Sequence, residues 1–318
     1  MEIKSSLVDI DSIEYELFIN GTFVESVSDE RIQVKYPYDG QTWASVPAGS
    51  PTDVDKAIEA ARGAFNEWQS IAPSTRREVL HQIADVLDQY AEELGRLETW
   101  QNGKLLREMQ SQMEGLGEWY RYFAGFVDKH QGDVNPVENK DGQFFNYTRK
   151  EPLGVVGAIT PWNSPLLLTT FKLAPALAAG NTVVHKPSQQ TPVSALRFAE
   201  LLSKKTDLPD GVYNVVTGTG STVGDSLLKH EDIDKLAFTG STEVGRSVAE
   251  QAGKNIVPVS LELGGKSPNI IFPSANLDNA INGVIKGIFA ATGQTCLAGS
   301  RVFVHDDVYD EFVDRFVD

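Results

Sequence analysis

The single cysteine of the 318-residue chain, Cys296, follows the segment Gly293-Gln294-Thr295, and Gly299 comes shortly after it. Glycines on both sides let the backbone turn sharply and bring amide N–H groups close to the sulfur. Such amides favour a thiolate and can stabilise an oxyanion. A lone cysteine is more often a small buried residue. The segment is therefore consistent with a nucleophile or with a core residue.

A carboxylate, Glu262, stands near the end of an apolar run and is followed by Leu263-Gly264-Gly265-Lys266. A carboxylate in such a run is costly unless it has a partner or faces a cleft. One interpretation is an ion pair with Lys266. The other is a general base at the carboxyl end of a strand, where sites form in parallel sheets.

Asn163 belongs to the segment Thr160-Pro161-Trp162-Asn163-Ser164-Pro165, between an apolar strand pattern and a helix pattern. Two prolines restrict this backbone, and the side-chain amide offers N–H donors to a ligand. An asparagine at such a junction can equally serve as a helix cap or a turn residue. Both roles remain open from the residues alone.

Two glycine-rich turns and one lysine could hold phosphate groups. The turn from Gly218 to Gly224 misses the G-x-G-x-x-G spacing by one residue, which makes it a weak dinucleotide signal. Phe238-Thr239-Gly240-Ser241 links a strand to a helix, so its free amides could face a pyrophosphate. Lys186 closes another strand and could contact a ribose or a phosphate, or simply face solvent.

The sequence contains no recognisable motif for a metal site, a redox cysteine pair or a serine hydrolase. The five histidines show no H-x-x-x-H spacing, and the sequence has neither a C-x-x-C pair nor a G-x-S-x-G elbow. We therefore expect no metal site.

These residues need a framework, and the region after Pro152 supplies one by alternating strand and helix patterns. Strands separated by such helices predict an α/β fold with a parallel sheet covered on both faces. Helices are expected from Pro165 towards Gly180 and from Pro192, Thr222 and Gly240. The expected strands are Val155–Ile159, Thr182–His185, Tyr213–Val216, Lys235–Phe238 and Val257–Leu261.

The region before Pro152 is different. Asn20-Gly21 predicts a hairpin between Tyr15–Ile19 and Thr22–Val24. Three helices should follow: one capped by Thr52, one starting after Pro73, and one that runs from Met109 to Val127 with a stripe of methionines and aromatics for packing. Short alternating runs predict a second hairpin at 134–152.

After the sheet, a shorter series begins. It consists of a strand at Asn269–Phe272, a helix from Leu277 to about Ala291, a strand at Arg301–Val304 and a helical face from Val308. This series is too short to complete a sheet domain of its own.

Charge and composition exclude several classes. The chain carries 28 basic and 44 acidic residues, a net charge of −16, which repels nucleic acids and anionic membranes. No stretch approaches the roughly 18 apolar residues of a membrane helix. The N-terminus, Met1-Glu2-Ile3-Lys4, lacks the layout of a signal peptide, and one cysteine excludes an internal disulfide. We expect a cytoplasmic protein that binds neither nucleic acid nor membrane.

Five ordered segments together resemble the NAD(P)-dependent aldehyde dehydrogenase superfamily, and the likeness extends over nearly all of the chain. The 34-residue separation of Glu262 from Cys296 is also similar to the family. The segments are Thr160-Pro161-Trp162-Asn163, Lys186-Pro187-Ser188, Phe238-Thr239-Gly240-Ser241, Glu262-Leu263-Gly264-Gly265-Lys266 and Gly293-Gln294-Thr295-Cys296.

The resemblance implies an aldehyde substrate that Cys296 attacks, an oxyanion held by Asn163 and the Cys296 amide, and a thioester that Glu262 helps to hydrolyse. Relatives that pass the acyl group to coenzyme A generally lack a carboxylate at this position, so Glu262 favours hydrolysis. The implied cofactor residues for NAD or NADP are Ile159, Thr160, Pro161, Trp162, Lys186, Ser188, Gln189, Gly220, Gly224, Phe238, Gly240, Ser241 and Leu263.

One departure concerns the choice between NAD and NADP. Many family members have glutamate where this chain has Gln189. A carboxylate there would bond the ribose 2′-hydroxyl and repel a 2′-phosphate, whereas a neutral amide does not repel it. The sequence therefore leaves both cofactors open.

The resemblance also implies a Rossmann-type cofactor domain (1–133 and 153–264), a β-hairpin oligomerisation arm (134–152) and the first part of a catalytic domain (265–318). Only 22 residues (297–318) follow Cys296, whereas family members continue further. We expect the chain to be the N-terminal part of an enzyme that forms a homo-oligomer when complete. The alternative is a non-catalytic remnant that binds a nucleotide or a partner.

Overall fold

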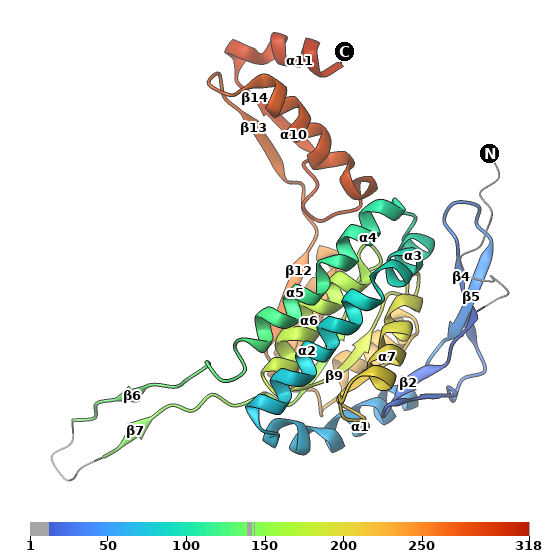
Figure 1. The fold of residues 1–318 in the computed structure, drawn as a ribbon, viewed down its shortest axis with the longest axis vertical. Coiled ribbons are helices and arrows are strands. Elements are labelled where there is room, and N and C mark those ends of the chain that lie inside the picture. Colours follow the sequence, from blue (N-terminus) through green and yellow to red (C-terminus); the bar gives the residue numbers. More distant parts are fainter. Residues whose placement is uncertain (1–12, 139–141, 143, 318) are drawn as a thin grey trace.

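A seven-stranded sheet is the centre of the molecule (Figure 1). The computed structural model describes residues 13–138, 142 and 144–317, so the expectations for Met1–Lys4 lie outside the described residues. The strand order is β12-β11-β8-β9-β10-β2-β3, and the first five strands are parallel. These five are β12 (Val259–Leu263), β11 (Lys235–Gly240), β8 (Val155–Ile159), β9 (Thr182–Lys186) and β10 (Tyr213–Val215).

Helices cover both faces of this sheet, which confirms the predicted α/β class. Side chains alternate along a strand, so Val155 points to one face and Val156 to the other. The Val156 face packs under α2 (Pro73–Gln89), α5 (Leu116–Ala124), α6 (Pro165–Ala178) and α7 (Val193–Lys205). The Val155 face packs under α1 (Pro51–Ser70), α8 (Asp225–Lys229) and α9 (Thr242–Asn255).

The predicted N-terminal hairpin is confirmed as β2 (Leu17–Ile19) and β3 (Thr22–Val24), which extend the sheet beyond β10. Asn20 and Gly21 both have positive φ, as the tight turn requires. A separate three-stranded sheet, not predicted from the sequence, contains β1 (Ile13–Glu14), β5 (Thr42–Pro47) and β4 (Arg31–Lys35).

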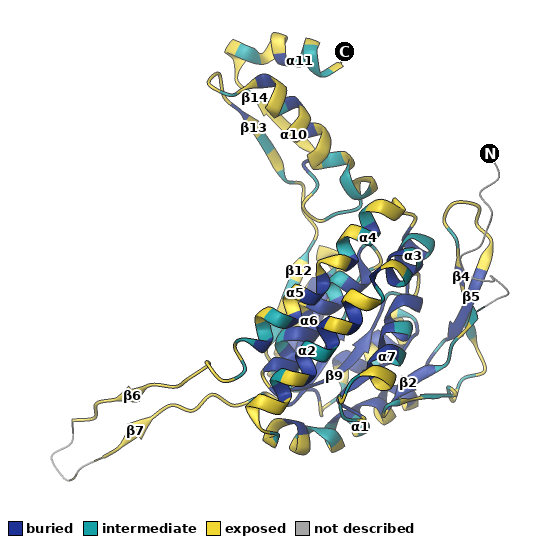
Figure 2. Cartoon of the chain, viewed as in Figure 1, coloured by how far each residue is buried: buried dark blue, intermediate teal, exposed yellow. Residues whose placement is uncertain are grey.

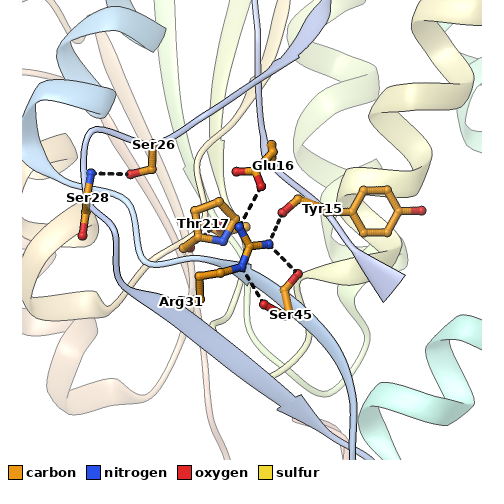
Figure 3. Close-up of polar contacts among 8 residues, drawn as sticks. Tyr15, Glu16, Ser26, Ser28, Arg31, Ser45 and Thr217 are labelled. Atoms are coloured by element: carbon orange, nitrogen blue, oxygen red, sulfur yellow. Dashed lines mark hydrogen bonds and ion pairs between the residues drawn. The ribbon is translucent and has the colours of Figure 1, made fainter. Parts of the chain in front are cut away.

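Arg31 binds this small sheet together (Figure 3). Its guanidinium donates to the Ser45 hydroxyl at 2.6 Å, to the Tyr15 carbonyl at 2.6 Å and to Glu16 at 2.7 Å. The neighbouring Thr217 hydroxyl donates to the Pro47 carbonyl at 2.7 Å. The small sheet is therefore attached to the segment that leaves β10.

Two helix predictions in this half are wrong. The first helix begins at Pro51, and its cap is Ser50 instead of Thr52, because Ser50 and Asp53 form a reciprocal capping box. The expected helix from Met109 to Val127 is two helices, α4 (Leu106–Glu114) and α5, which are separated at Gly115. In addition, α3 (Ala91–Asn102) follows α2 after a break at Tyr90.

The second hairpin is present as an extended arm, β6 (Val134–Asn135) paired with β7 (Asn146–Tyr147) (Figure 1). Residues 139–141 and 143 of the predicted 134–152 hairpin lie outside the described residues.

Several element boundaries in the sheet region differ from the predicted ones by one or more residues, and three of the differences have a local explanation. β12 begins at Val259 instead of Val257, because Ile256 takes a left-handed conformation and the Val257 amide still bonds back to Ala252. Ser241 caps α9, so that helix begins at Thr242 instead of Gly240. The helix expected from Thr222 is a π-helical turn, η1 (Gly220–Gly224), followed by α8.

Residues 265–317 form a terminal unit that projects from the sheet (Figure 1). Its two strands, β13 (Pro268–Ile271) and β14 (Arg301–Val304), are parallel and pack with α10 (Leu277–Phe289) and α11 (Tyr309–Val317). Short 3₁₀ turns, η2 (Ala290–Gly293) and η3 (Asp306–Val308), follow α10 and precede α11. Within the described part of the chain, no helix has the length and apolar character needed to cross a membrane.

Candidate active site

The carboxyl ends of four adjacent parallel strands bring the predicted residues together. In the strand register, Ile159 lies opposite Lys186 on one side and opposite Phe238 on the other, and Thr239 lies opposite Glu262. Residues that are more than 100 positions apart in the sequence therefore meet at one edge of the sheet. This edge is where parallel α/β sheets bind ligands.

The turn that carries Asn163 starts from a buried anchor. The Thr160 amide donates to the Lys186 carbonyl at 3.2 Å, and the Thr160 hydroxyl lies 2.8 Å from Nε2 of His185. The other ring nitrogen of His185 lies 2.8 Å from the hydroxyl of Tyr213. Burial, together with Lys172 and Lys186, lowers the pKa of His185 to about 3, so its ring is neutral at pH 7. The sequence pattern did not point to this support.

Asn163 reaches the segment that carries the cysteine. Its half-buried side chain donates from Nδ2 to the carbonyl oxygen of Gln294 at 2.9 Å, two residues before Cys296. A primary amide has two N–H donors, so one is used here and a second is available to another acceptor. Asn163 is not the cap of α6, because the preceding position of that helix is Ser164 and no side chain caps it.

Cys296 and Glu262 line one groove of about 710 Å³. Both side chains are exposed, so the interpretation of Cys296 as a core residue is wrong. The backbone of Gly265 lies beside the cysteine segment, since a side-chain carbon there would make an ordinary contact of 3.4 Å with the carbonyl oxygen of Cys296. Apolar side chains from α6 and the sheet, among them Leu168 and Phe238, form the rest of the wall.

Lys172 is a buried member of this groove that the sequence reasoning missed. It lies on α6 and its ammonium donates to the hydroxyl of Thr239. Burial lowers the pKa of Lys172 to about 8, and the negative charge of Glu262 opposes that shift. A signal was present, since Lys172 is the only charged residue in a 14-residue helix whose other side chains are mostly apolar.

The alternative ion pair between Glu262 and Lys266 is not formed in the described structure. No ion pair of either residue occurs among residues 13–138, 142 and 144–317. Lys266 is exposed, and its backbone carbonyl accepts from Nε of Arg301 at 2.8 Å. Glu262 is thus free to face the groove.

Among the candidate cofactor residues, Lys186 is buried and has a defined hydrogen bond. It is 5% exposed, and its ammonium donates to the carbonyl of Pro187 at 3.0 Å. Burial lowers the pKa of Lys186 to about 8. A side-chain carbon at Gly224 would lie 3.9 Å from the Lys186 stem, so the glycine turn η1 passes close to the buried amine. No carboxylate pairs with this lysine in the described residues.

The other glycine turn is also compatible with a close ligand. Ser241 caps α9 by accepting from the Val244 amide at 3.2 Å, and Ser241 itself is exposed. A side-chain carbon at Gly240 would lie 2.4 Å from the Phe238 ring, which explains why glycine is required there. At Gly220 the space beside the backbone is open.

Two predicted cofactor residues lie apart from the cysteine groove. Trp162 and Gln189 line a second cavity of about 700 Å³, together with Tyr36 and Gln294. The hydroxyl of Ser188 accepts from the Gln190 amide at 3.3 Å, within the same turn. The segment at Gln294 therefore borders one cavity and Cys296 borders the other.

Across the described positions, no group of three or more histidine, cysteine, aspartate or glutamate side chains is arranged to hold a metal ion.

The chain is similar in sequence and in fold to known aldehyde dehydrogenases. The aldehyde dehydrogenase family matches residues 23–318. An aldehyde dehydrogenase of Enchytraeus buchholzi is 47% identical over 313 residues, covering 95% of this chain and 61% of that protein. Aldehyde dehydrogenase 1A1 of Macaca fascicularis is 45% identical over 312 residues, covering 96% of this chain and 62% of that protein.

Solved structures of similar proteins have the same fold as this chain. An NAD⁺ complex of an aldehyde dehydrogenase from Bacillus cereus is 42% identical with a TM-score of 0.91, covering 96% of this chain and 62% of that one. An NADP-dependent enzyme from E. coli is 38% identical with a TM-score of 0.92, covering 96% and 63%. The chain spans about three fifths of the length of these relatives. Because the family match covers most of its residues, the chain belongs to the aldehyde dehydrogenase family.

Proposed function

We propose that the complete protein oxidises an aldehyde to a carboxylic acid with NAD⁺ or NADP⁺, using Cys296 as nucleophile and Glu262 as general base. The observation that carries this proposal is the shared groove, in which an exposed thiol and an exposed carboxylate border the same space. The hydrogen bond from Asn163 to the Gln294 carbonyl supports a third role, because it keeps an amide donor beside the thiol segment.

In the first step, the sulfur of Cys296 bonds to the carbonyl carbon of the aldehyde, and the π electrons move to the oxygen. The resulting thiohemiacetal oxyanion requires donors. We assign these to the free N–H of Asn163 and to the backbone amide of Cys296. The apolar groove wall, including Leu168 and Phe171, would exclude water from the aldehyde.

The residues at the sheet edge fit a dinucleotide. Lys186 is a buried cation without a carboxylate partner among the described residues, next to the glycine turn at Gly224, and an anionic or hydroxylated ligand would satisfy it. The space beside the Gly220 backbone is open and Ser241 is exposed, so both positions suit a phosphate group. Lys186 and these turn residues would hold the dinucleotide, which would supply the hydride acceptor needed to oxidise the thiohemiacetal on Cys296 to a thioester.

In the last step, Glu262 accepts a proton from a water molecule whose oxygen attacks the thioester carbon. The new C–O bond forms, the C–S bond breaks and the sulfur leaves as thiolate, which releases the carboxylic acid. The buried ammonium of Lys172 lines the same groove as Glu262. A base at this position supports hydrolysis over transfer to coenzyme A.

Cofactor choice rests on Gln189, which is exposed and neutral. We infer that a 2′-phosphate is tolerated, so NAD⁺ and NADP⁺ should give similar catalytic efficiency. A strict preference for NAD⁺ in steady-state kinetics would contradict this inference.

The test follows NAD(P)H absorbance with a panel of aldehydes, using the complete protein and its Cys296→Ala variant. Turnover that disappears in Cys296→Ala supports the proposal, and turnover that survives in that variant overturns it. The 318-residue chain is tested in parallel for NADH binding by fluorescence, with Lys186→Met expected to weaken binding about tenfold and the exposed Lys205→Met to leave it unchanged. Binding without turnover by this chain fits the small size of its terminal unit, because a loosely held thiol loses near-attack geometry.

A further inference from the structure

The segment that leads to Cys296 contains a left-handed turn, residues 291–293. The φ angles of Ala291, Thr292 and Gly293 are 54°, 54° and 70°. This conformation suits glycine, but it is disfavoured for residues that carry a side chain, such as alanine and threonine. A turn of this kind persists only where neighbouring groups hold it. Because the turn ends shortly before the thiol, whatever holds the turn also determines where Cys296 lies.

Glu108, on α4, holds the left-handed turn from outside the terminal unit. Oε2 of its half-buried carboxylate accepts from the Ala291 amide at 3.0 Å, across 183 positions of the sequence. A carboxylate that accepts from a backbone amide forms a charge-assisted hydrogen bond, which is stronger than a bond between neutral groups. The turn is therefore joined to a helix that belongs to a different part of the molecule.

The left-handed turn also determines where the Asn163 amide points. The Gln294 amide donates to the Ala291 carbonyl at 3.0 Å, which attaches Gln294 to the end of the turn. The carbonyl of Gln294 accepts from Nδ2 of Asn163 at 2.9 Å. A shift of the turn would therefore move the cysteine segment and also rotate the amide to which we assign the oxyanion.

On the other side of Cys296, the chain is held within the terminal unit itself. The Gly299 amide donates to the Gly287 carbonyl at 3.0 Å, and Nδ2 of Asn269 donates to the Gly299 carbonyl at 3.0 Å. These bonds attach Gly299 to α10 and to β13. They connect the thiol to its own unit, so its placement relative to Asn163 depends on the contacts that precede it.

The corner from α3 to α4 is itself bonded to the turn that carries Asn163. Lys104, in the connection between the two helices, is only 2% exposed, and its ammonium donates to the Ser164 hydroxyl at 2.9 Å. Glu98, on α3, is fully buried, and its Oε1 accepts from the Leu166 amide at 3.3 Å. Both partners follow Asn163 closely in the chain. A contact from α4 to the cysteine segment therefore relates that segment directly to the Asn163 turn.

We propose that Glu108 is a positioning residue for the nucleophile: its carboxylate holds the left-handed turn at Ala291 and thereby places the thiol of Cys296 at the sheet edge. The inference rests on the proposed function in taking Cys296 as the nucleophile. A displacement of about 1 Å at a reacting group can cost about a hundredfold in rate, so the loss of one such contact should be measurable.

The first measurement is hydrogen exchange of the 318-residue chain, read by mass spectrometry on peptides that cover residues 290–297. Glu108→Ala should speed exchange there about tenfold, because the turn opens once its acceptor is removed. Glu108→Asp keeps the charge but shortens the side chain by one carbon, and it should act in the same direction. Glu108→Gln keeps an oxygen acceptor at the same reach and should preserve most of the protection. Glu114→Ala, at an exposed glutamate of the same helix, is the matched control and should change nothing.

A second substitution tests whether backbone strain is the reason for the contact. Glycine adopts positive φ about as readily as negative φ, so Ala291→Gly removes the penalty of the left-handed conformation at that position. In the Ala291→Gly background, Glu108→Ala should speed exchange only about twofold. An equal effect of Glu108→Ala in both backgrounds would mean that Glu108 does not act through the strained turn, and it would overturn the inference.

The third measurement is steady-state kinetics of the complete protein. Glu108→Ala should lower kcat/KM for the aldehyde about tenfold and leave the KM for NAD(P)⁺ within about twofold of wild type. Glu108→Gln should recover most of the lost kcat/KM. Faster exchange at residues 290–297 without a change in kcat/KM would make the contact structural only, and this outcome also overturns the inference.

Glu108→Asp decides the question if near-UV circular dichroism shows that Glu108→Ala does not fold. A folded variant of either kind with wild-type exchange at residues 290–297 contradicts the proposed role. The exchange measurement needs neither aldehyde nor dinucleotide. Its failure is therefore separate from a failure of the proposed function, which would appear as an absence of NAD(P)H formation by the complete wild-type protein.

Discussion

The central sheet and the terminal unit hold opposite parts of the candidate site, and Figure 2 shows how differently they are buried. In β8 and β9, nine of ten residues are buried under helices on both faces. In the terminal unit, the described apolar core consists of five buried side chains, whereas Phe272, Phe289 and Phe303 are more than half exposed. Lys186 belongs to the first region and Cys296 to the second.

This contrast means that the two halves of the chemistry have different supports. The proposed cofactor residues are held by strand register inside a packed sheet, where movement would disrupt many contacts. The thiol is held through a few contacts at the base of its unit, namely Asn163 to Gln294 and Ala291 to Glu108. Nucleotide binding should therefore be more robust than thiol placement in this chain.

The largest expected difference between the regions is in unfolding. Leu173, on α6, is 1% exposed in the main core, so Leu173→Ala should lower the global free energy of unfolding by about 3 kcal/mol. Ile281, on α10, belongs to the small core, and Ile281→Ala should act mainly on the local opening of residues 265–317. Hydrogen exchange read by mass spectrometry separates the two effects.

The control for this comparison is Leu106→Ala, because Leu106 is 38% exposed and its truncation should change stability by less than about 0.5 kcal/mol. If Ile281→Ala reduced protection throughout the central sheet, the terminal unit would be part of one cooperative core. The central sheet and the terminal unit would then unfold together.

Much of the sheet could be predicted from the sequence, for a physical reason. Strands such as Val155–Ile159 are continuous apolar runs between glycine and proline turns, which is how strands buried on both faces appear. The candidate site residues at the carboxyl edge of the sheet could be predicted as well, because each lies where a strand pattern ends. The predicted start of a helix was wrong where a capping residue determines it. Ser50 caps the first helix instead of Thr52, because Ser50 and Asp53 bond to each other reciprocally.

The supports of the site could not be predicted, because they are single side chains from distant elements. Glu98 and Lys104 look like ordinary helix-surface charges in the sequence, and only the fold shows that both are buried against Ser164 and Leu166. His185 likewise looks in the sequence like an ordinary residue near the end of a strand, and only the fold shows its hydrogen bond with Tyr213. The hydrophobic periodicity that identifies a strand or a helix contains no information about such contacts between distant side chains.

An effect of intermediate size is expected in the central sheet, where the free energy of unfolding should depend on pH. The pKa of His185 is lowered from 6.5 to about 3, so the unfolded chain binds the proton more readily than the folded chain. Stability should therefore fall as pH decreases from about 6.5 towards 3, with about 2 kcal/mol lost between pH 7 and pH 5. In His185→Gln, whatever its stability at pH 7, this pH-dependent loss should disappear from urea unfolding curves.

His130 is exposed near the base of the arm, and His130→Gln should keep the wild-type loss between pH 7 and pH 5. If His185→Gln and wild type lost stability equally over that range, then the His185 imidazole would not be buried in its neutral form. The anchor proposed for Thr160 would then lack its rigid partner.

The smallest expected effect concerns the junction of the two regions, where β12 ends and the terminal unit begins. Lys266 is exposed and makes no ion pair in the described structure, so Lys266→Met should change the free energy of unfolding by less than about 0.5 kcal/mol. It should also leave the pH dependence of aldehyde turnover by the complete protein unchanged. A loss above about 1 kcal/mol in Lys266→Met would instead favour an ion pair with Glu262. That carboxylate would then hold the terminal unit to the sheet, and a group committed to such a contact is poorly placed to take a proton from water.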